Sequence, residues 1–282
     1  VRGDFTTSAL VWPIGVIQHV NQTYAFGWTE TNTRGLWSLS AGPTWTEVAT
    51  AGAPADNEDV IDAAVLGQDL FLACGLTDLR RRDGAGVWTQ PAAGEQAYCL
   101  AAWEDDTIVK GFIDSPSAGL VQSLTFEKST DRGVTWTAVA TIGTTTDAPI
   151  SMVPFLATAP EGGLTRVLAV GFIEGVWALD ITNLRAWRIL DLSTQTNVHN
   201  CRTLLAGTGA GEASNVILYV QVGLLGLREL HPDGRVIDVG LNREDGLPAE
   251  RQGVISAITD TNDFLYVAVG KAVADVISPI GA

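Results

Sequence analysis

Short runs of β-forming residues recur along the chain, each beginning at a polar residue and ending at a glycine. The runs are rich in Val, Leu, Phe and Tyr and too short for helices, a pattern typical of buried strands. The closing glycines lie 36 to 60 residues apart. The pattern therefore predicts six repeats. The six runs are Thr23–Gly27, Asp69–Gly75, Thr107–Gly111, Arg166–Gly171, Asn215–Gly223 and Asp263–Gly270.

Another short run precedes each of these and holds small and branched residues such as Ala, Val and Ile. That composition suits a strand packed close to its neighbours around an axis, so we expect these runs to be the innermost strands. The six preceding runs are Val16–Val20, Val60–Leu66, Tyr98–Trp103, Ile150–Ala157, Cys201–Ala206 and Val254–Thr259.

A turn with its own signature follows the third copy, where residues 129–136 read Ser-Thr-Asp-Arg-Gly-Val-Thr-Trp. Asp131 and Gly133 occupy positions where a tight turn needs a side-chain acceptor and a residue free to adopt positive φ. The side chains of Ser129 and Asp131 are expected to bond backbone groups of the turn. Trp136 begins the next strand, and its ring can cover the turn.

The pattern S-x-D-x-G-x-T-W resembles the Asp-box of the BNR-type repeat, which occurs in β-propellers such as sialidases, sortilin-like receptors and some plant photosynthetic assembly factors. The resemblance implies a structural turn rather than a reaction. Its five fixed positions are Ser129, Asp131, Gly133, Thr135 and Trp136. Decayed copies end at Trp45, Trp88, Trp187 and Val236, so a second marker repeats with nearly the same period.

A period of 40–50 residues with four short strands per unit is typical of a β-propeller blade. We therefore predict an all-β fold, a six-bladed β-propeller of four-stranded antiparallel blades in a single domain, residues 1–282. A seven-bladed division, with about 40 residues per blade, is the alternative. The predicted blades are 13–50, 58–91, 97–142, 149–192, 198–240, and 252–282 with 4–12.

The last blade is short, because only 12 residues follow Gly270. The strand-like segment Phe5–Trp12 is expected to supply its fourth strand. An N-terminal strand that joins the last blade would close the ring and remove an open sheet edge.

Composition limits the classes of partner that we expect. The net charge is −15, and no basic patch could neutralise phosphates, so nucleic acid is not expected as a partner. Hydrophobic residues make up 46% of the chain, yet no apolar stretch reaches the roughly 18 residues of a membrane span. The apolar excess should lie in buried strands or in interfaces. Cys74, Cys99 and Cys201 are expected to be buried thiols, with a Cys74–Cys99 bridge as the alternative.

No catalytic set is apparent. A sialidase-like hydrolase would need three arginines for the substrate carboxylate, a Tyr–Glu nucleophile pair and an acid/base Asp. The Arg-Ile-Pro signature usual in that family is absent, since Val11-Trp12-Pro13 does not match it. Three tyrosines fall inside predicted strands as packing residues: Tyr24, Tyr219 and Tyr266. The three histidines, His19, His199 and His231, lack metal-ligand spacing, so neither a metal nor a cofactor is expected.

For binding, the candidates are Trp, Arg and Glu residues in loops of the first and last blades, which are neighbours in a closed ring. Such residues hold sugars or peptides through stacking and bidentate bonds. The candidate residues are Trp28, Glu30 and Arg34, together with Arg243, Glu244 and Arg251.

We expect a non-catalytic module that binds other protein subunits in an extracellular or virion (phage tail or capsid) assembly. A lectin-like, carbohydrate-binding propeller is the alternative, with glycan as its partner, and a divergent Asp-box glycoside hydrolase is a third.

Overall fold

The computed structural model describes most of the chain, and every regular element in the described part is a β-strand. The strands divide between two compact units, Val1–Pro149 and Ile150–Ala282, and each is considered by itself. The described residues are 10–29, 34–39, 44–48, 50–54, 60–75, 77–114, 122–145, 151–172, 175–191, 204–208, 216–221, 227–238, 255–260 and 265–269.

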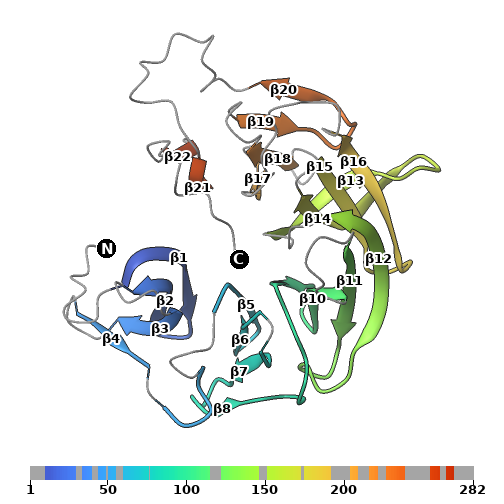
Figure 1. Ribbon diagram of the computed structural model, residues 1–282. Helices are drawn as coiled ribbons and strands as arrows, with labels where there is room; N and C mark the ends of the chain where they lie inside the picture. The colour runs from blue at the N-terminus through green and yellow to red at the C-terminus, as the bar shows by residue number, and fades with distance from the viewer. Residues whose placement is uncertain are drawn as a thin grey trace. The chain divides into compact units, whose positions relative to one another are not determined.

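The first unit contains three four-stranded antiparallel sheets, each a simple meander (Figure 1). The first sheet is β1 (Leu10–His19), β2 (Gln22–Thr29), β3 (Arg34–Leu39) and β4 (Trp45–Glu47). The second is β5 (Asp62–Leu66), β6 (Asp69–Ala73), β7 (Arg80–Arg82) and β8 (Trp88–Thr89). The third is β9 (Cys99–Trp103), β10 (Thr107–Asp114), β11 (Gln122–Ser129) and β12 (Thr137–Thr145).

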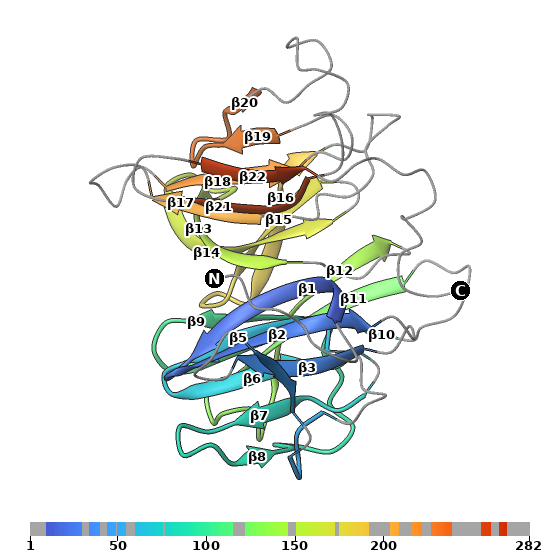
Figure 2. The same cartoon turned by 90° about the vertical axis from the view of Figure 1, so that its left-hand side faces the viewer.

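The second unit repeats this plan, and Figure 2 shows the strands of its sheets lying side by side. The fourth sheet is β13 (Met152–Thr158), β14 (Leu164–Phe172), β15 (Gly175–Asp180) and β16 (Arg185–Asp191). The fifth is β17 (Leu204–Thr208), β18 (Val216–Gln221), β19 (Leu227–Leu230) and β20 (Val236–Asp238). The sixth has two described strands, β21 (Ile255–Asp260) and β22 (Leu265–Val269).

The predicted strand runs are confirmed. The six runs that end in glycine coincide with β2, β6, β10, β14, β18 and β22, and the preceding runs coincide with the first strand of each sheet. Within the first unit β5 contacts both β1 and β9, and within the second β17 contacts both β13 and β21. The first strands of consecutive sheets are therefore neighbours in each unit, as expected of innermost strands.

The N-terminal segment differs from the expectation. Leu10 pairs with Thr29 and Trp12 with Trp28, so residues 10–12 begin β1 of the first sheet instead of forming a separate strand. The reason is continuity, because the extended backbone of β1 runs through Pro13 with bulges on either side of it. Residues 4–9 of the proposed closing strand lie outside the described part.

The core of the first unit lies between its sheets. Every residue of β6 is buried, with Leu70 and Leu72 in the cluster shared with the first sheet. Phe71 and Ala73 belong to the cluster shared with the third sheet. Because successive side chains of a strand point to opposite faces, a strand buried on both faces reads as a continuous apolar run. Burying each Leu or Phe contributes about 1.5–3 kcal/mol.

The cysteine alternative is wrong for the residues described. Cys74 and Cys99 are both buried thiols, and neither forms a disulfide. Cys201 lies outside the described residues.

Candidate functional site

The turn between β11 and β12 has the hydrogen bonds that its sequence predicts. Asp131 Oδ1 accepts from the backbone N–H groups of Val134 (3.2 Å) and Thr135 (2.8 Å), and Oδ2 accepts from Thr135 Oγ1 (2.6 Å). Ser129 Oγ donates to Asp131 (2.7 Å) and accepts from Gly133 N (2.8 Å). The hydrogen bonds from Thr135 and Ser129 lower the pKa of Asp131 to about 2. All these bonds stay inside the turn, so the motif builds structure.

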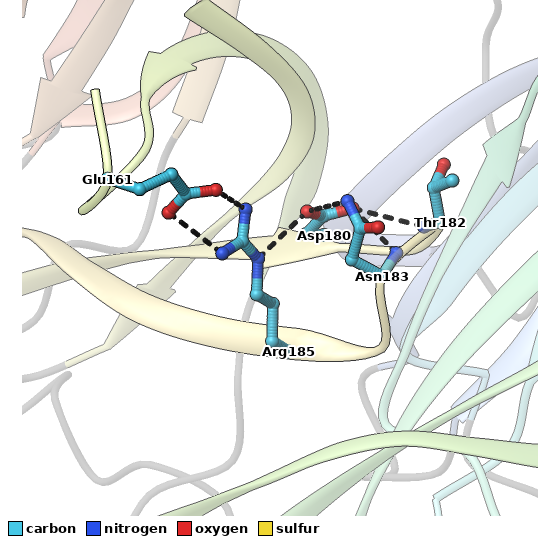
Figure 3. A network of polar contacts seen from close by, with 5 residues as sticks. All are labelled: Glu161, Asp180, Thr182, Asn183 and Arg185. Carbon is cyan, nitrogen blue, oxygen red and sulfur yellow. Dashed lines mark hydrogen bonds and ion pairs between the residues drawn. The ribbon is translucent and has the colours of Figure 1, made fainter. Parts of the chain in front are cut away.

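A related turn joins β15 to β16, and Figure 3 shows its polar network. Asp180 is fully buried and accepts from the backbone N–H groups of Thr182 (3.1 Å) and Asn183 (3.0 Å). The Asn183 side chain (2.8 Å) and Arg185 Nε (3.1 Å) also donate to it. Arg185 in turn donates two hydrogen bonds to Glu161. Arg185 therefore bridges two carboxylates, and these contacts raise its pKa.

A buried lysine lies beside the first of these turns. Lys110 on β10 is 1% exposed and forms ion pairs with Glu95 and with Glu127 (3.2 Å). Its ammonium lies 4.5 Å from the ring centre of Trp136 and 4.9 Å from that of Phe112. This cluster was not predicted from the sequence. The available signal was a lysine inside the otherwise apolar run 107–111.

The structure describes only part of the predicted binding cluster. Trp28 on β2 and Arg34 on β3 are cross-strand partners, so their backbones lie side by side. Their side chains are outside the described part, as are the whole residues Glu30, Arg243, Glu244 and Arg251. The cluster as a whole therefore stays a prediction.

His19 and Tyr24 are structural. His19 is buried, with Nε2 2.7 Å from the Gln68 carbonyl oxygen, and Arg82 donates to its Nδ1 (3.3 Å). Tyr24 is buried and meets Trp88 edge to face, with ring centres 6.3 Å apart. Among the described residues, no three His, Cys, Asp or Glu side chains gather in a way that could hold a metal ion.

Asp62 on β5 is a carboxylic acid with a strongly raised pKa. Its carboxylate accepts from the backbone N–H of Leu100 (2.8 Å) on β9 and of Ala63 (2.9 Å). Neighbouring atoms keep water away from it, and this desolvation raises its pKa to about 7 in spite of those hydrogen bonds. Asp62 thus joins the first strands of two sheets, β5 and β9, through a side chain.

A pocket of about 580 Å³ opens among the hairpin turns of the second and third sheets, and we call it the turn pocket. Asp69 is buried in its wall, and one carboxylate oxygen, Oδ2, lies 3.0 Å from Arg81 Nη2 and 3.5 Å from Arg132 Nε. Arg132 projects from the turn 129–136 and is 65% exposed. The two guanidinium groups therefore share a single carboxylate.

Acidic side chains complete the turn pocket. Asp83, Asp105 and Asp106 line it, which makes four carboxylates against two guanidinium groups. The lining residues include no aromatic side chain, histidine or cysteine. Such a surface can form ion pairs and hydrogen bonds with a polar chain, and it offers no aromatic stacking platform. No helix in the described residues is long and apolar enough to cross a membrane.

Comparisons with known proteins identify the fold. The sequence matches no family model and no curated protein. The structure is similar to the extracellular domain of a hybrid two-component system from B. thetaiotaomicron (TM-score 0.64, 12% identity), covering 94% of this chain and 32% of that one. It is similar to YCF48 bound to D1 peptide, with a TM-score of 0.51 and 13% identity over 89% of this chain and 73% of that one. It is also similar to the SapL1 lectin in complex with alpha methyl fucoside, with a TM-score of 0.53 and 10% identity over 90% of this chain and 94% of that one.

These three structures are propeller-type folds, so the chain has a β-propeller fold. The chain spans about a third of the length of the first of them.

Proposed function

We propose that the chain is a six-bladed propeller in which each sheet is one blade and the turn 129–136 is an Asp-box. Five four-stranded sheets and a sixth pair of strands in the described residues support the number. The sixth blade would be completed by residues after Val269 and by the N-terminal residues 4–9, which precede β1. Closure of this kind leaves no open sheet edge.

The propeller acts as a non-catalytic module that binds other protein subunits in an extracellular or virion assembly. The observation that carries this proposal is the turn pocket, where Arg81 and Arg132 share Asp69 beside exposed acids. Paired charges of both signs around a polar hollow suit a protein segment with complementary charges. The similar structure with a bound peptide and the one that is an extracellular domain support the class of partner and the location.

The test is selection of peptides from a random displayed library against the intact protein, followed by titration of the selected peptides. We expect affinity to fall at least about tenfold in a variant that combines Arg132→Gln with Asp105→Asn and Asp106→Asn, since charged pairs at an interface dominate its specificity. The matched control combines Asp233→Asn and Arg235→Gln in the β19–β20 turn, far along the chain from the turn pocket. Equal affinity in all three proteins would contradict the proposal.

Carbohydrate binding is the second candidate function. The observation that favours it is a small pocket in the second unit, lined in part by Trp187 and His231. Aromatic rings with polar edges are suited to sugars, because a sugar presents both C–H faces and hydroxyl groups.

A further inference from the structure

The small pocket, which we call the Trp187 pocket, has a volume of about 180 Å³ and lies between the fourth and fifth sheets. Phe155 on β13 and Leu230 on β19 are buried in its wall, and Trp187 and Ile189 on β16 pack against the same core cluster. The backbone N–H of Thr158 (3.0 Å) and its hydroxyl (2.7 Å) both donate to the Pro232 carbonyl oxygen. These bonds tie the β19–β20 turn to β13 and hold this side of the pocket in place.

Two ring nitrogens beside this pocket are buried and have no hydrogen-bond partner among the described residues: Trp187 Nε1 and His231 Nε2. Arg235 lies 3.4 Å from His231 Nδ1, and because a guanidinium only donates, Nδ1 accepts and Nε2 carries the proton. The Glu229 carboxylate is 3.4 Å from Nε2 without making a hydrogen bond. Buried donors without partners are rare, so each calls for an acceptor.

The charges nearby favour a neutral acceptor. Arg188, which lines the pocket, is paired with Asp191 (3.0 Å) and lies over the Trp177 ring at 5.1 Å. Arg185, which lies 5.2 Å from the Trp187 ring centre, is held by Asp180 and Glu161 (Figure 3). With Arg185 and Arg188 already paired, Arg235 exposed to solvent and Glu229 close to His231, the pocket gives a carboxylate or phosphate little net attraction.

Size separates a ligand from a bridging water. A water occupies about 30 Å³ in the liquid, so the pocket has room for about six. An indole ring, an apolar wall and two N–H donors in that volume match one six-membered sugar ring, whose C–H face packs on aromatic surface while its hydroxyl oxygens accept hydrogen bonds.

We propose that the Trp187 pocket binds a single neutral pyranose, with hydroxyl oxygens accepting from Trp187 Nε1 and His231 Nε2. The proposal rests on the second of the two functions given above. It assigns that function to the face between the fourth and fifth sheets, away from the predicted loop cluster at Trp28 and Arg34.

The experiment is ligand-observed NMR of the intact protein with a panel of uncharged methyl pyranosides. We expect saturation transfer to at least one of them and a shift of one indole N–H resonance in the wild-type protein. Trp187→Phe and His231→Phe each remove one donor and keep an aromatic ring, and we expect each to raise Kd about tenfold. Trp45→Phe in β4 of the first sheet is the matched control, because this indole does not line the pocket, and it should leave Kd unchanged.

The outcomes separate the site from the function. If no pyranoside binds the wild-type protein, the pocket holds water only, and the proposal and carbohydrate binding fall together. If a pyranoside binds but both variants keep wild-type affinity, carbohydrate binding stands and this pocket is the wrong site. The indole resonance in the wild-type protein decides the question even if a variant fails to fold, because a bound pyranose that leaves every indole N–H unshifted contradicts the proposal.

Discussion

The turns 129–136 and 180–187 both satisfy their backbone N–H groups with an aspartate, but they use different residues to do so. The first uses a carboxylate in its third position, and the second uses Asp180 in its first, with Arg185 and Asn183 as extra donors. The left-handed backbone position is retained in both, at Gly133 (φ 86°) and at Leu184 (φ 54°). The left-handed position is therefore kept where the sequence motif is lost, because several sets of side chains can satisfy the same backbone groups.

The closing tryptophans show a second difference. Seven residues, 130–136, separate β11 from β12, and four, 181–184, separate β15 from β16. Since a strand alternates its faces, a change of three residues moves a side chain to the other face. Trp136 packs with residues of the preceding, second sheet, and Trp187 packs with residues of the following, fifth sheet. The cation beside Trp136 is buried Lys110, whereas the one beside Trp187 is Arg185, 35% exposed.

The largest expected effect comes from removing the buried cation. Lys110→Met leaves the Glu95 and Glu127 carboxylates without their partner, and we expect it to lower the free energy of unfolding by about 3–5 kcal/mol. Arg185→Met should cost less, because solvent screens its pair with Glu161 and because Asp180 keeps the hydrogen bonds from Thr182 and Asn183. Denaturant titration of both variants measures the difference, and equal losses would show that the two turns do not differ in this way.

The next effect depends on pH. Burial holds the Asp62 pKa near 7, so folding favours its protonated form, and this contribution is complete below about pH 4 and lost as pH rises through 7. Relative to Asp62→Asn, the wild-type protein should lose up to about 1.4 kcal/mol of stability for each pH unit between roughly pH 4 and 7.

The pH dependence of stability that Asp131 contributes should have the opposite sign. Its pKa of about 2 means that its contribution is present above about pH 4 and lost as pH falls toward 2. Melting curves from pH 2 to 8 measure both pH dependences, and a wild-type curve parallel to that of Asp62→Asn would refute the raised pKa of Asp62.

A smaller effect is expected at the second turn. Asp180→Ala removes the acceptor of Thr182 N, Asn183 N and Arg185 Nε, and should lower the free energy of unfolding by about 2 kcal/mol. Asp180→Asn, which keeps one acceptor oxygen, should recover part of this loss. If Asp180→Ala melts like the wild-type protein, other groups satisfy the turn and the network in Figure 3 contributes no stability.

The smallest effect concerns the shared backbone position. Leu184→Gly relieves a left-handed leucine and should raise the free energy of unfolding by up to about 1 kcal/mol. Gly133→Ala should lower the free energy of unfolding. The added Cβ would lie 3.3 Å from Pro91, and alanine adopts the positive φ of this position unfavourably. Chemical denaturation of the pair checks the signs, and a loss of stability in Leu184→Gly would mean that packing at Leu184 outweighs its strain.

Strands could be predicted from the sequence because their signal is local: a run such as 69–75 is apolar on both faces and ends at a turn. The turn bonds of Ser129 and Asp131 were predictable for the same reason. The pockets were not, since Phe155, Trp187 and His231 meet only through the packing of two sheets. The Lys110 cluster likewise depends on Glu95 and Glu127, which come from a loop and a neighbouring strand.

The central claim is that this propeller binds its ligands without reacting with them. An NMR time course of the wild-type protein with 4-nitrophenyl and methyl pyranosides tests it most directly. We predict that every glycoside stays intact over a day, whether or not it is bound. A growing signal of free sugar that disappears on replacing one acid, such as Asp105 in the turn pocket, would show catalysis and contradict the account.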